Sequence, residues 1–280
     1  MMLELPESKN LAKQIKENLL GKTIMNVMVN KSPHKFAWFS HDEYSYHDKL
    51  VEKSITDTDA YGGMVEILID DMRLVFFDGT NLRFYAQGEK LPDKHQLHIE
   101  FDDFSSFICS VQMYGGILLF DNTELDNPHY HDSKTKVSPL SDKNTEDYFL
   151  DLMDSVKQTY SVKAFLATEQ RYPGLGNGVL QDILFNAKIH PRRKLASLSQ
   201  QEKTAIYNSL KQTLLEMTLQ GGRDTEKDIF GQPGGYQTKL SAKTKLQPCP
   251  DCGDDIVKEA FMGGAIYFCP TCQKFEKAKR

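Results

Sequence analysis

The sequence predicts an α+β fold in three parts: a β-sandwich, a helical domain and a small C-terminal hairpin held by cysteines. Apolar residues alternate with strand period up to about residue 121 and recur at helical spacing from about residue 143, and four of the five cysteines fall in the last 32 residues. A chain of 280 residues is long enough for two domains that each bury a core. The expected boundaries are residues 1–121 for an N-terminal helix and the β-sandwich, 122–142 for a linker, 143–242 for the helical domain and 243–280 for the cysteine module.

The N-terminal part begins with a helix expected from about Ser8 to Leu20, followed by short runs of strand-forming residues. Four of these strands are expected at residues 64–69, 74–77, 97–101 and 117–120. The turn-forming pairs Asp70-Asp71, Asp78-Gly79 and Gly115-Gly116 are expected to separate strands. Short strands divided by turns predict a β-sandwich or a flattened barrel. The polar stretch that follows contains two prolines and is typical of a linker.

Helical periodicity then runs through four stretches, at residues 148–153, 162–166, 179–185 and 199–219. A glycine-rich turn, Pro173-Gly-Leu-Gly-Asn-Gly178, opens directly onto the third stretch. Glycines let backbone N–H groups approach an anion closely, and a helix start adds the positive end of its dipole. Asn177 is expected both to cap this helix and to donate to a phosphate. The alternative is that the glycines form only a turn.

The four C-terminal cysteines form two Cys-x-x-Cys pairs, Cys249/Cys252 and Cys269/Cys272, with sixteen residues between the pairs. This spacing predicts a structural, tetrahedral zinc site, because each pair can turn two thiolates toward one ion. A disulfide-bonded tail is the alternative, and it fits poorly with a chain that shows no secretion signal. Cys109 stands alone in an apolar run and is expected to be a buried, inert thiol.

The net charge of −5 argues against a strongly basic surface of the kind that phosphate binding requires. Residues 41–104 contain 15 acidic and 6 basic residues, which leaves the rest of the chain at +4. The acidic stretch is expected to be a solvated face, so phosphate contact is open to the remainder of the chain. Since neither a transmembrane stretch nor a secretion signal is present, a soluble cytoplasmic protein without a membrane partner is expected.

Several motifs resemble the signature of the formamidopyrimidine-DNA glycosylase and endonuclease VIII family, including its helix-two-turn-helix domain. They are Lys163-Ala-Phe-Leu-x-x-x-Gln170, Gly174-Leu-Gly-Asn177, Ile183-Leu-Phe185 and Ala187-Lys-Ile-His-Pro191, then Gly221-Gly-Arg223 and Gly231-Gln-Pro-Gly234. The cysteine module follows in the family's order. Glu4-Leu-Pro-Glu7 resembles the family's N-terminal Pro-Glu-Leu-Pro-Glu. The resemblance spans nearly the whole chain.

The resemblance implies a monomeric base-excision-repair protein that clamps damaged double-stranded DNA and flips the lesion out of the stack, without a small-molecule cofactor. It also implies an association with the nucleoid when DNA is bound. By similarity Lys163, Gly176 and Asn177 hold backbone phosphates, together with the zinc hairpin. Glu4 matches the family's catalytic glutamate, and Glu7 matches the second carboxylate of the motif. The alternative for both carboxylates is a capping or dipole role at a helix start.

Some residues depart from the family's pattern. The family's nucleophile is an N-terminal proline amine that attacks C1′ and forms a Schiff base, and Leu3 stands at that position after two methionines. Where the family has a lysine in a loop of the β domain, this chain has glycine, within residues 59–63. The position of the family's zinc-finger arginine is taken by Gly264 or Ala265. The segment that fills the gap left by the flipped base corresponds to residues 110–115. Met113 and Tyr114 could wedge into a base stack there, or they could belong to the core of a strand.

Three functions stay open at this point. The first is a DNA N-glycosylase in which Glu4 activates water, or in which the Met1 amine reaches C1′ by a rearranged path, with weak or absent AP lyase activity. The second is a catalytically inactive lesion sensor or accessory protein that binds damaged DNA through Lys163, Asn177 and the zinc finger. The third is reuse of the scaffold for a ligand other than DNA. Damaged-DNA binding is the prediction that the first two share.

Overall fold

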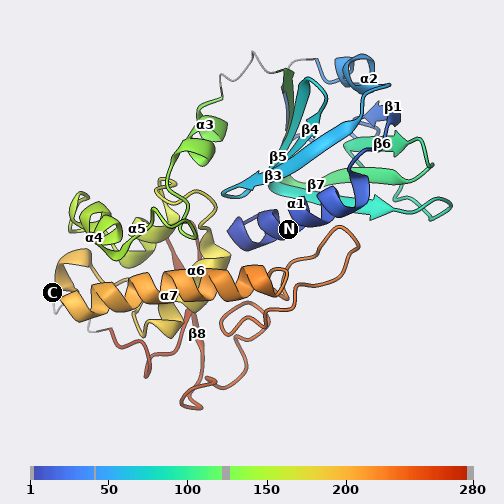
Figure 1. The fold of residues 1–280 in the computed structure, drawn as a ribbon. Helices are drawn as coiled ribbons and strands as arrows, with labels where there is room; N and C mark the ends of the chain where they lie inside the picture. Colours follow the sequence, from blue (N-terminus) through green and yellow to red (C-terminus); the bar gives the residue numbers. More distant parts are fainter. Residues whose placement is uncertain (1–2, 41, 122–126, 276–280) are drawn as a thin grey trace. The chain divides into compact units, whose positions relative to one another are not determined.

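A computed structural model describes residues 3–40, 42–121 and 127–275 of the chain, and Figure 1 shows its helices and strands. The chain divides into two compact units, one made of residues 1–135 with 221–235 and the other of residues 136–220 with 236–280. The segment 221–235 was expected in the helical domain and groups instead with the N-terminal unit. The α+β prediction is confirmed, whereas the three-part division with a linker at 122–142 stays a prediction. None of the helices among the described residues has the length and apolar character needed to cross a bilayer.

The first unit is built on one mixed sheet and three helices. Its helices are α1 (Leu5–Leu19), α2 (Ser45–Leu50) and α3 (Pro128–Thr135). Its strands are β1 (Ile24–Val29), β2 (Ala37–Phe39), β3 (Ile55–Tyr61), β4 (Met64–Ile69), β5 (Met72–Tyr85), β6 (Leu97–Phe101) and β7 (Ser106–Asp121). The strand order is β1-β6-β7-β5-β4-β3, and the short β2 pairs with β7 in the parallel sense. The helix α1 packs along β3 and β4.

The two long strands β5 and β7 pair with each other twice and thereby join two halves of the sheet. Residues 72–78 pair with 115–121, residues 80–85 pair with 106–111, and the register shifts in between. One apolar cluster joins residues of both halves to α1, and the rings of Phe76 and Phe107 meet across it at 5.8 Å. The sheet therefore closes over its own core as the predicted β-sandwich.

The turns expected at Asp78-Gly79 and Gly115-Gly116 are wrong, because both pairs lie inside the long strands β5 and β7. These glycines serve close approach between strands. A Cβ on Gly79 would lie 2.2 Å from the backbone oxygen of Tyr114, and a Cβ on Gly116 would lie 2.0 Å from the ring of Phe77. Glycine occurs both in tight turns and where two strands approach each other closely. The sequence pattern alone therefore does not tell which of the two a glycine indicates.

The second unit contains the predicted helices and the cysteine hairpin. Its elements are α4 (Glu146–Asp154), α5 (Val162–Ala167), α6 (Asn177–Asn186), the 3₁₀ turn η1 (Leu195–Ser197), α7 (Gln200–Leu219), β8 (Val257–Phe261) and β9 (Gly264–Phe268). The longest helix, α7, begins at a capping box in which Ser199 and Glu202 each satisfy the other's backbone N–H. A two-residue turn with positive φ at Met262 and Gly263 joins β8 to β9, as a tight hairpin requires.

Replacing Gly79 by Ala is expected to lower the free energy of unfolding by roughly 2–3 kcal/mol, because the added methyl group must displace backbone rather than a flexible side chain. Urea denaturation measures this loss. Gly88→Ala is the control: its Cβ would enter open space, and its φ of +83° alone costs about 1 kcal/mol. Equal losses in the two variants would show that the contact between β5 and β7 does not require glycine.

Candidate metal centre and nucleic-acid interface

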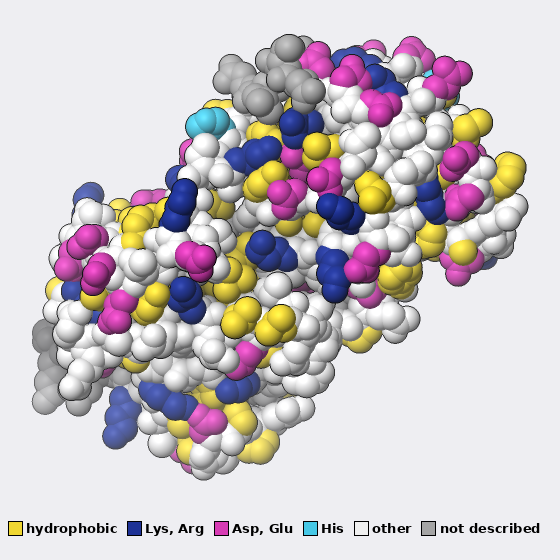
Figure 2. All heavy atoms as spheres, viewed as in Figure 1, with side chains coloured by type: hydrophobic (Ala, Val, Ile, Leu, Met, Phe, Trp, Pro, Cys, Tyr) yellow, Lys and Arg dark blue, Asp and Glu magenta, His cyan; other side chains and the backbone are white. Residues whose placement is uncertain are grey.

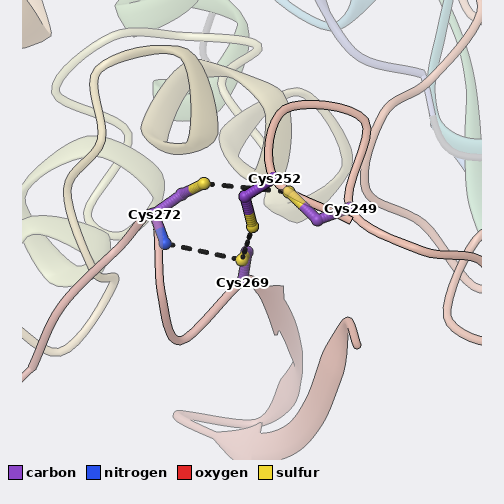
Figure 3. Close-up of side chains that lie close together, drawn as sticks. All are labelled: Cys249, Cys252, Cys269 and Cys272. Atoms are coloured by element: carbon purple, nitrogen blue, oxygen red, sulfur yellow. Dashed lines mark hydrogen bonds between the residues drawn. The ribbon is translucent and has the colours of Figure 1, made fainter. Parts of the chain in front are cut away.

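The four C-terminal cysteines converge on one point, as Figure 3 shows. Their sulfur atoms all lie within 4.8 Å of one another. The Sγ atoms of Cys249 and Cys272 are 3.8 Å apart, and those of Cys252 and Cys269 are 3.4 Å apart. A tetrahedron with metal–sulfur bonds of about 2.3 Å has edges of about 3.8 Å, so the cluster has the dimensions of a four-thiolate metal site. Four thiolates would complete the coordination of the ion.

The hairpin that carries two of these cysteines is fixed to one face of α6. Asn177, Gln181 and Phe185 follow one another at intervals of four residues and therefore share a face of the helix. The side-chain nitrogen of Asn177 donates to the carbonyl of Ala265 at 2.7 Å, and the side-chain oxygen of Gln181 accepts the N–H of Tyr267 at 3.0 Å. Phe185 packs in a small apolar cluster that includes the first cysteine of each pair. The position of the hairpin thus depends on α6.

Lys163 meets the same hairpin beside Asn177. Its ammonium group donates to the carbonyl of Phe261 at 2.8 Å. Burial and the charge of Arg192 lower the pKa of Lys163. A Cβ on Gly264 would lie 3.6 Å from both the Lys163 ammonium nitrogen and the Asn177 amide nitrogen. Lys163 is 3 % exposed, and because Gly264 has no side chain, no Cβ occupies the position next to these two donors. We call Lys163, Asn177 and Gly264 the donor corner.

The start of α6 differs from the prediction in one respect. Gly176, with an extended backbone, is the N-cap, and Asn177 is the first helical residue. The prediction that Asn177 caps the helix is therefore wrong, because its side chain turns to the hairpin carbonyl instead. Gly176 precedes it directly, so all three residues expected to hold phosphate lie in the second unit with the hairpin.

The two N-terminal carboxylates are buried around an arginine. Glu4 is 1 % exposed, Glu7 is 4 % exposed, and Arg223 is 3 % exposed. Arg223 binds Glu7 through two side-chain nitrogens, at 2.9 and 2.8 Å, and also through its backbone N–H at 3.1 Å. A third side-chain nitrogen lies 3.5 Å from Glu4. Burial lowers the pKa of Arg223, but the charges of the two carboxylates outweigh it and the pKa is raised.

Arg223 is a site residue that the sequence analysis missed, although the motif Gly221-Gly222-Arg223 was recognised. Both glycines have positive φ, at +76° and +98°, which brings the arginine back onto α1. A Cβ on Gly222 would be in van der Waals contact with a carboxylate oxygen of Glu7, at 3.4 Å, so it is the positive φ that favours glycine here. The two glycines before the arginine are the only feature of the sequence that points to its buried position.

Met113 and Tyr114 lie on a bulge of β7. Three residues, 112–114, stand opposite the single Gly79, and all three are exposed. Met113 is 71 % exposed and Tyr114 is 38 % exposed. The alternative that they belong to the core of a strand is therefore excluded. Glu4, Glu7 and this bulge belong to the first unit, whereas the donor corner and the cysteines belong to the second.

Charges of both signs are interspersed on the face shown in Figure 2, and no broad surface of a single sign is visible there. This distribution agrees with the net charge of −5. On this face, contact with an anion would therefore depend on local groups rather than on a general basic field.

The formamidopyrimidine-DNA glycosylase H2TH domain model matches residues 136–228. The formamidopyrimidine-DNA glycosylase of Cytobacillus firmus is 28 % identical over 285 aligned positions, which cover 97 % of this chain and 100 % of the relative. Over its whole length the chain is therefore similar to the formamidopyrimidine-DNA glycosylase family. The enzyme of the same name from Lactobacillus delbrueckii subsp. bulgaricus is 25 % identical and covers 98 % of this chain and 100 % of the relative.

Solved structures of family members share the fold. Lactococcus lactis Fpg in complex with DNA containing an abasic site matches with a TM-score of 0.82 at 22 % identity, over 97 % of this chain and 100 % of that one. The MutM (Fpg) protein of Thermus thermophilus matches with a TM-score of 0.80 at 22 % identity, over 98 % and 100 %. These matches cover both units, so the whole chain has the family's architecture. The correspondence of Leu3 with the proline of the family's N-terminal motif stays a prediction, and Met1 and Met2 lie outside the described residues.

Asp182, on α6, anchors the segment that leads into the cysteine module. Its two carboxylate oxygens accept the backbone N–H groups of Lys239 and Leu240, at 2.9 and 2.8 Å. Burial raises the pKa of Asp182 to about 6, against the lowering effect of these two bonds and of Tyr236. The folded chain therefore holds this proton more tightly than the unfolded chain does.

Between pH 4 and pH 6, Asp182 is expected to make the free energy of unfolding fall as the pH rises, by up to about 3 kcal/mol. The sign follows because the folded state binds more protons in this window. Urea denaturation of the wild type and of Asp182→Asn at several pH values in this window gives the free energy of unfolding of each protein. The difference between the two values measures the contribution of Asp182. Asp151→Asn, which replaces an exposed acid on α4 in the same way, is the control. A difference for Asp182→Asn that does not change with pH would contradict the assignment.

Cys252→Ser is expected to abolish binding of about one metal ion per chain and to unfold the hairpin, because three thiolates hold the ion much less tightly than four. Metal content by mass spectrometry and amide hydrogen exchange of residues 249–273 measure both effects. Cys109→Ala removes a buried thiol from the β-sandwich and should leave metal content and hairpin exchange unchanged. A hairpin that stays protected in Cys252→Ser would show that α6, and not the metal, holds it.

Proposed function

We propose that this chain binds damaged double-stranded DNA in base excision repair, as a DNA N-glycosylase with weak or absent AP lyase activity. The observation that carries the proposal is the donor corner, in which Lys163 and Asn177 meet at a hairpin position without a side chain. A DNA phosphate is the anion that the similarity to the formamidopyrimidine-DNA glycosylases supports. Lactococcus lactis Fpg binds DNA containing an abasic site, and this chain shares its fold.

Both donors keep capacity for a phosphate. The Lys163 ammonium has three N–H groups, and one is occupied by the carbonyl of Phe261. The Asn177 amide has two, and one is occupied by the carbonyl of Ala265. Partly desolvated, charge-assisted bonds of this kind are stronger than bonds between neutral groups. The hairpin carbonyls therefore hold the donors in place for a ligand.

We assign zinc as the ion held by Cys249, Cys252, Cys269 and Cys272, because four thiolates at these distances suit it. Zinc would supply folding energy to the hairpin and no reactive position. The chemistry must then come from the first unit. There Glu4 would take a proton from water while the water oxygen bonds to C1′ and the bond from C1′ to the base breaks, and the proton would leave with the base.

The expected weakness of the lyase step rests on residue chemistry. Schiff-base formation needs a free amine at C1′, and Leu3 stands where the family has its proline. Residues 62 and 63, in the loop where the family has a lysine, are glycines. An amine-dependent elimination therefore lacks its usual groups at both places.

A lesion sensor without catalysis is the second candidate, and the burial of Glu4 favours it. Glu4 is 1 % exposed and lies beside the charge of Arg223. A carboxylate held in this way has little access to water. In this candidate the chain would bind damaged DNA and leave its bonds intact.

Incubation with duplexes that contain an oxidised base or an abasic site, with and without borohydride, separates the candidates. Base release without covalent trapping, lost in Glu4→Gln, is the result expected for the glycosylase. Trapping would contradict the weak lyase, and N-terminal mass spectrometry would identify the amine. Specific binding without release or trapping would support the sensor.

Asn177→Ala is expected to weaken binding to an abasic-site duplex by roughly 1–3 kcal/mol, since it removes a donor to phosphate. Gel-shift titration measures this. Gln181→Ala is the matched control, because Gln181 also binds the hairpin but its amide nitrogen already donates to the carbonyls of Asn177 and Ala265, and its amide oxygen accepts the N–H of Tyr267. If the two variants lose affinity equally, Asn177 positions the hairpin and does not contact DNA.

A further inference from the structure

The second unit contains a cavity between the turn that follows α6 and the cysteine module. Its volume is about 200 Å³. This is below the roughly 300 Å³ at which sites for drug-sized ligands begin, so the cavity has room for one small ring system. Three polar residues, His190, Arg192 and Glu259, line it together with the rings of Phe268 and Phe275. None of these residues is a candidate for DNA contact, for catalysis or for metal binding.

The aromatic wall of the cavity is fixed by packing and hydrogen bonds. The ring of His190 stacks on the ring of Phe275 at 4.6 Å and meets the ring of Phe268 edge-on at 4.3 Å. Gln273, which is fully buried, also lines the cavity. Its amide donates to the carbonyl of Ile189 at 2.9 Å and accepts a backbone N–H of the second cysteine pair at 3.1 Å. These bonds tie the turn to the cysteine module, so the cavity is preformed and a ligand would not have to order it.

His190 carries a hydrogen-bond donor without an acceptor. The residue is 3 % exposed, and burial lowers the pKa of His190 to about 4, so its imidazole is neutral at pH 7. Its Nδ1 atom accepts the backbone N–H of Arg192 at 3.1 Å, which leaves the proton of the neutral ring on Nε2. Among residues 3–40, 42–121 and 127–275, no group accepts a hydrogen bond from Nε2. Buried donors normally have a partner, and a ligand in the cavity could supply it.

Arg192 and Glu259 form a charged pair at the cavity that leaves further bonding capacity. The Nε atom and one terminal nitrogen of Arg192 lie 3.1 and 2.9 Å from Oε2 of Glu259. The same terminal nitrogen donates to the carbonyl of Ala260 at 3.1 Å. Within the described part of the chain, neither Nη1 of Arg192 nor Oε1 of Glu259 has a hydrogen-bond partner. The two charges cancel, so the cavity favours an uncharged ligand with donors and acceptors over an anion such as phosphate.

We propose that this cavity binds a free nucleobase or its nucleoside, and that guanine fits it best. Guanine carries donors at N1 and N2 beside the acceptor O6, with a second acceptor at N7. Its donors suit the free oxygen of Glu259, and its acceptors suit the free donors of Arg192 and His190. Adenine has the donor N6 where guanine has O6, so it would place a donor against Arg192. The inference goes beyond the proposed function and does not depend on DNA binding.

Isothermal titration calorimetry of the full, zinc-loaded chain with guanosine tests the site, and adenosine is the comparison. We expect guanosine to bind at one site per chain and adenosine to bind roughly tenfold more weakly or worse. Glu259→Gln should weaken guanosine binding roughly five- to hundredfold, because an amide replaces the carboxylate acceptor. Phe275→Leu should weaken guanosine and adenosine binding by a similar factor, since stacking on a ring does not distinguish the bases.

Glu169→Gln is the matched control for the charged pair. Glu169 also pairs with an arginine of the second unit, Arg171, but it does not line the cavity. This variant should bind guanosine as the wild type does. Zinc content and circular dichroism check that each variant keeps its cysteine module and its fold.

Three results would overturn the inference. They are no binding by the wild type at millimolar guanosine, equal affinity of the wild type for guanosine and adenosine, and full guanosine affinity in both Glu259→Gln and Phe275→Leu. Each of them can occur while the wild type still binds an abasic-site duplex, and the proposed function would then stand. Guanosine binding in a chain that does not bind DNA would instead overturn the proposed function and keep the cavity as a nucleoside site.

Discussion

The contact between α6 and the β8–β9 hairpin is the interaction on which the second unit's candidate site depends. Strands of five residues do not form a stable hairpin on their own, so the cysteine module needs both its ion and a surface to rest on. The helix supplies this surface through Asn177, Gln181 and Phe185. The carbonyls of the same hairpin also bind the side chains of Lys163 and Asn177. The placement of these two donors is therefore coupled to the folding of the hairpin.

In the first unit, too, a contact within the fold lies next to the surface residues that were singled out from the sequence. The strands β5 and β7 approach each other closely at Gly79 and Gly116, and the bulge that exposes Met113 and Tyr114 lies opposite Gly79. A β-bulge commonly redirects side chains at a functional edge. A residue that relaxed the strand contact would therefore alter both the core and the surface that the bulge presents.

The sequence predicts the helices of the second unit and the cysteine cluster well, because helical periodicity and Cys-x-x-Cys spacing are local signals. The sequence does not predict contacts between residues that are far apart in the chain, or contacts of side chains with distant main-chain groups. Arg223 binds Glu7, which lies 216 positions away in the sequence. The partners of Lys163 and Asn177 are main-chain carbonyls, which the residue types in the sequence do not reveal. In the sequence Gly79 suggests a turn, because a tight turn and a close contact between strands both require glycine. The roles of the site residues stay predictions.

The buried group around Arg223 links stability to chemistry in the first unit. An arginine that is 3 % exposed requires carboxylate partners, and Glu7 accepts from two of its five side-chain N–H groups in a two-pronged contact. Glu4 lies farther from the guanidinium group, at 3.5 Å. Glu7 therefore makes the closer contact and anchors residues 221–235 to α1, whereas a catalytic role for Glu4 stays a prediction.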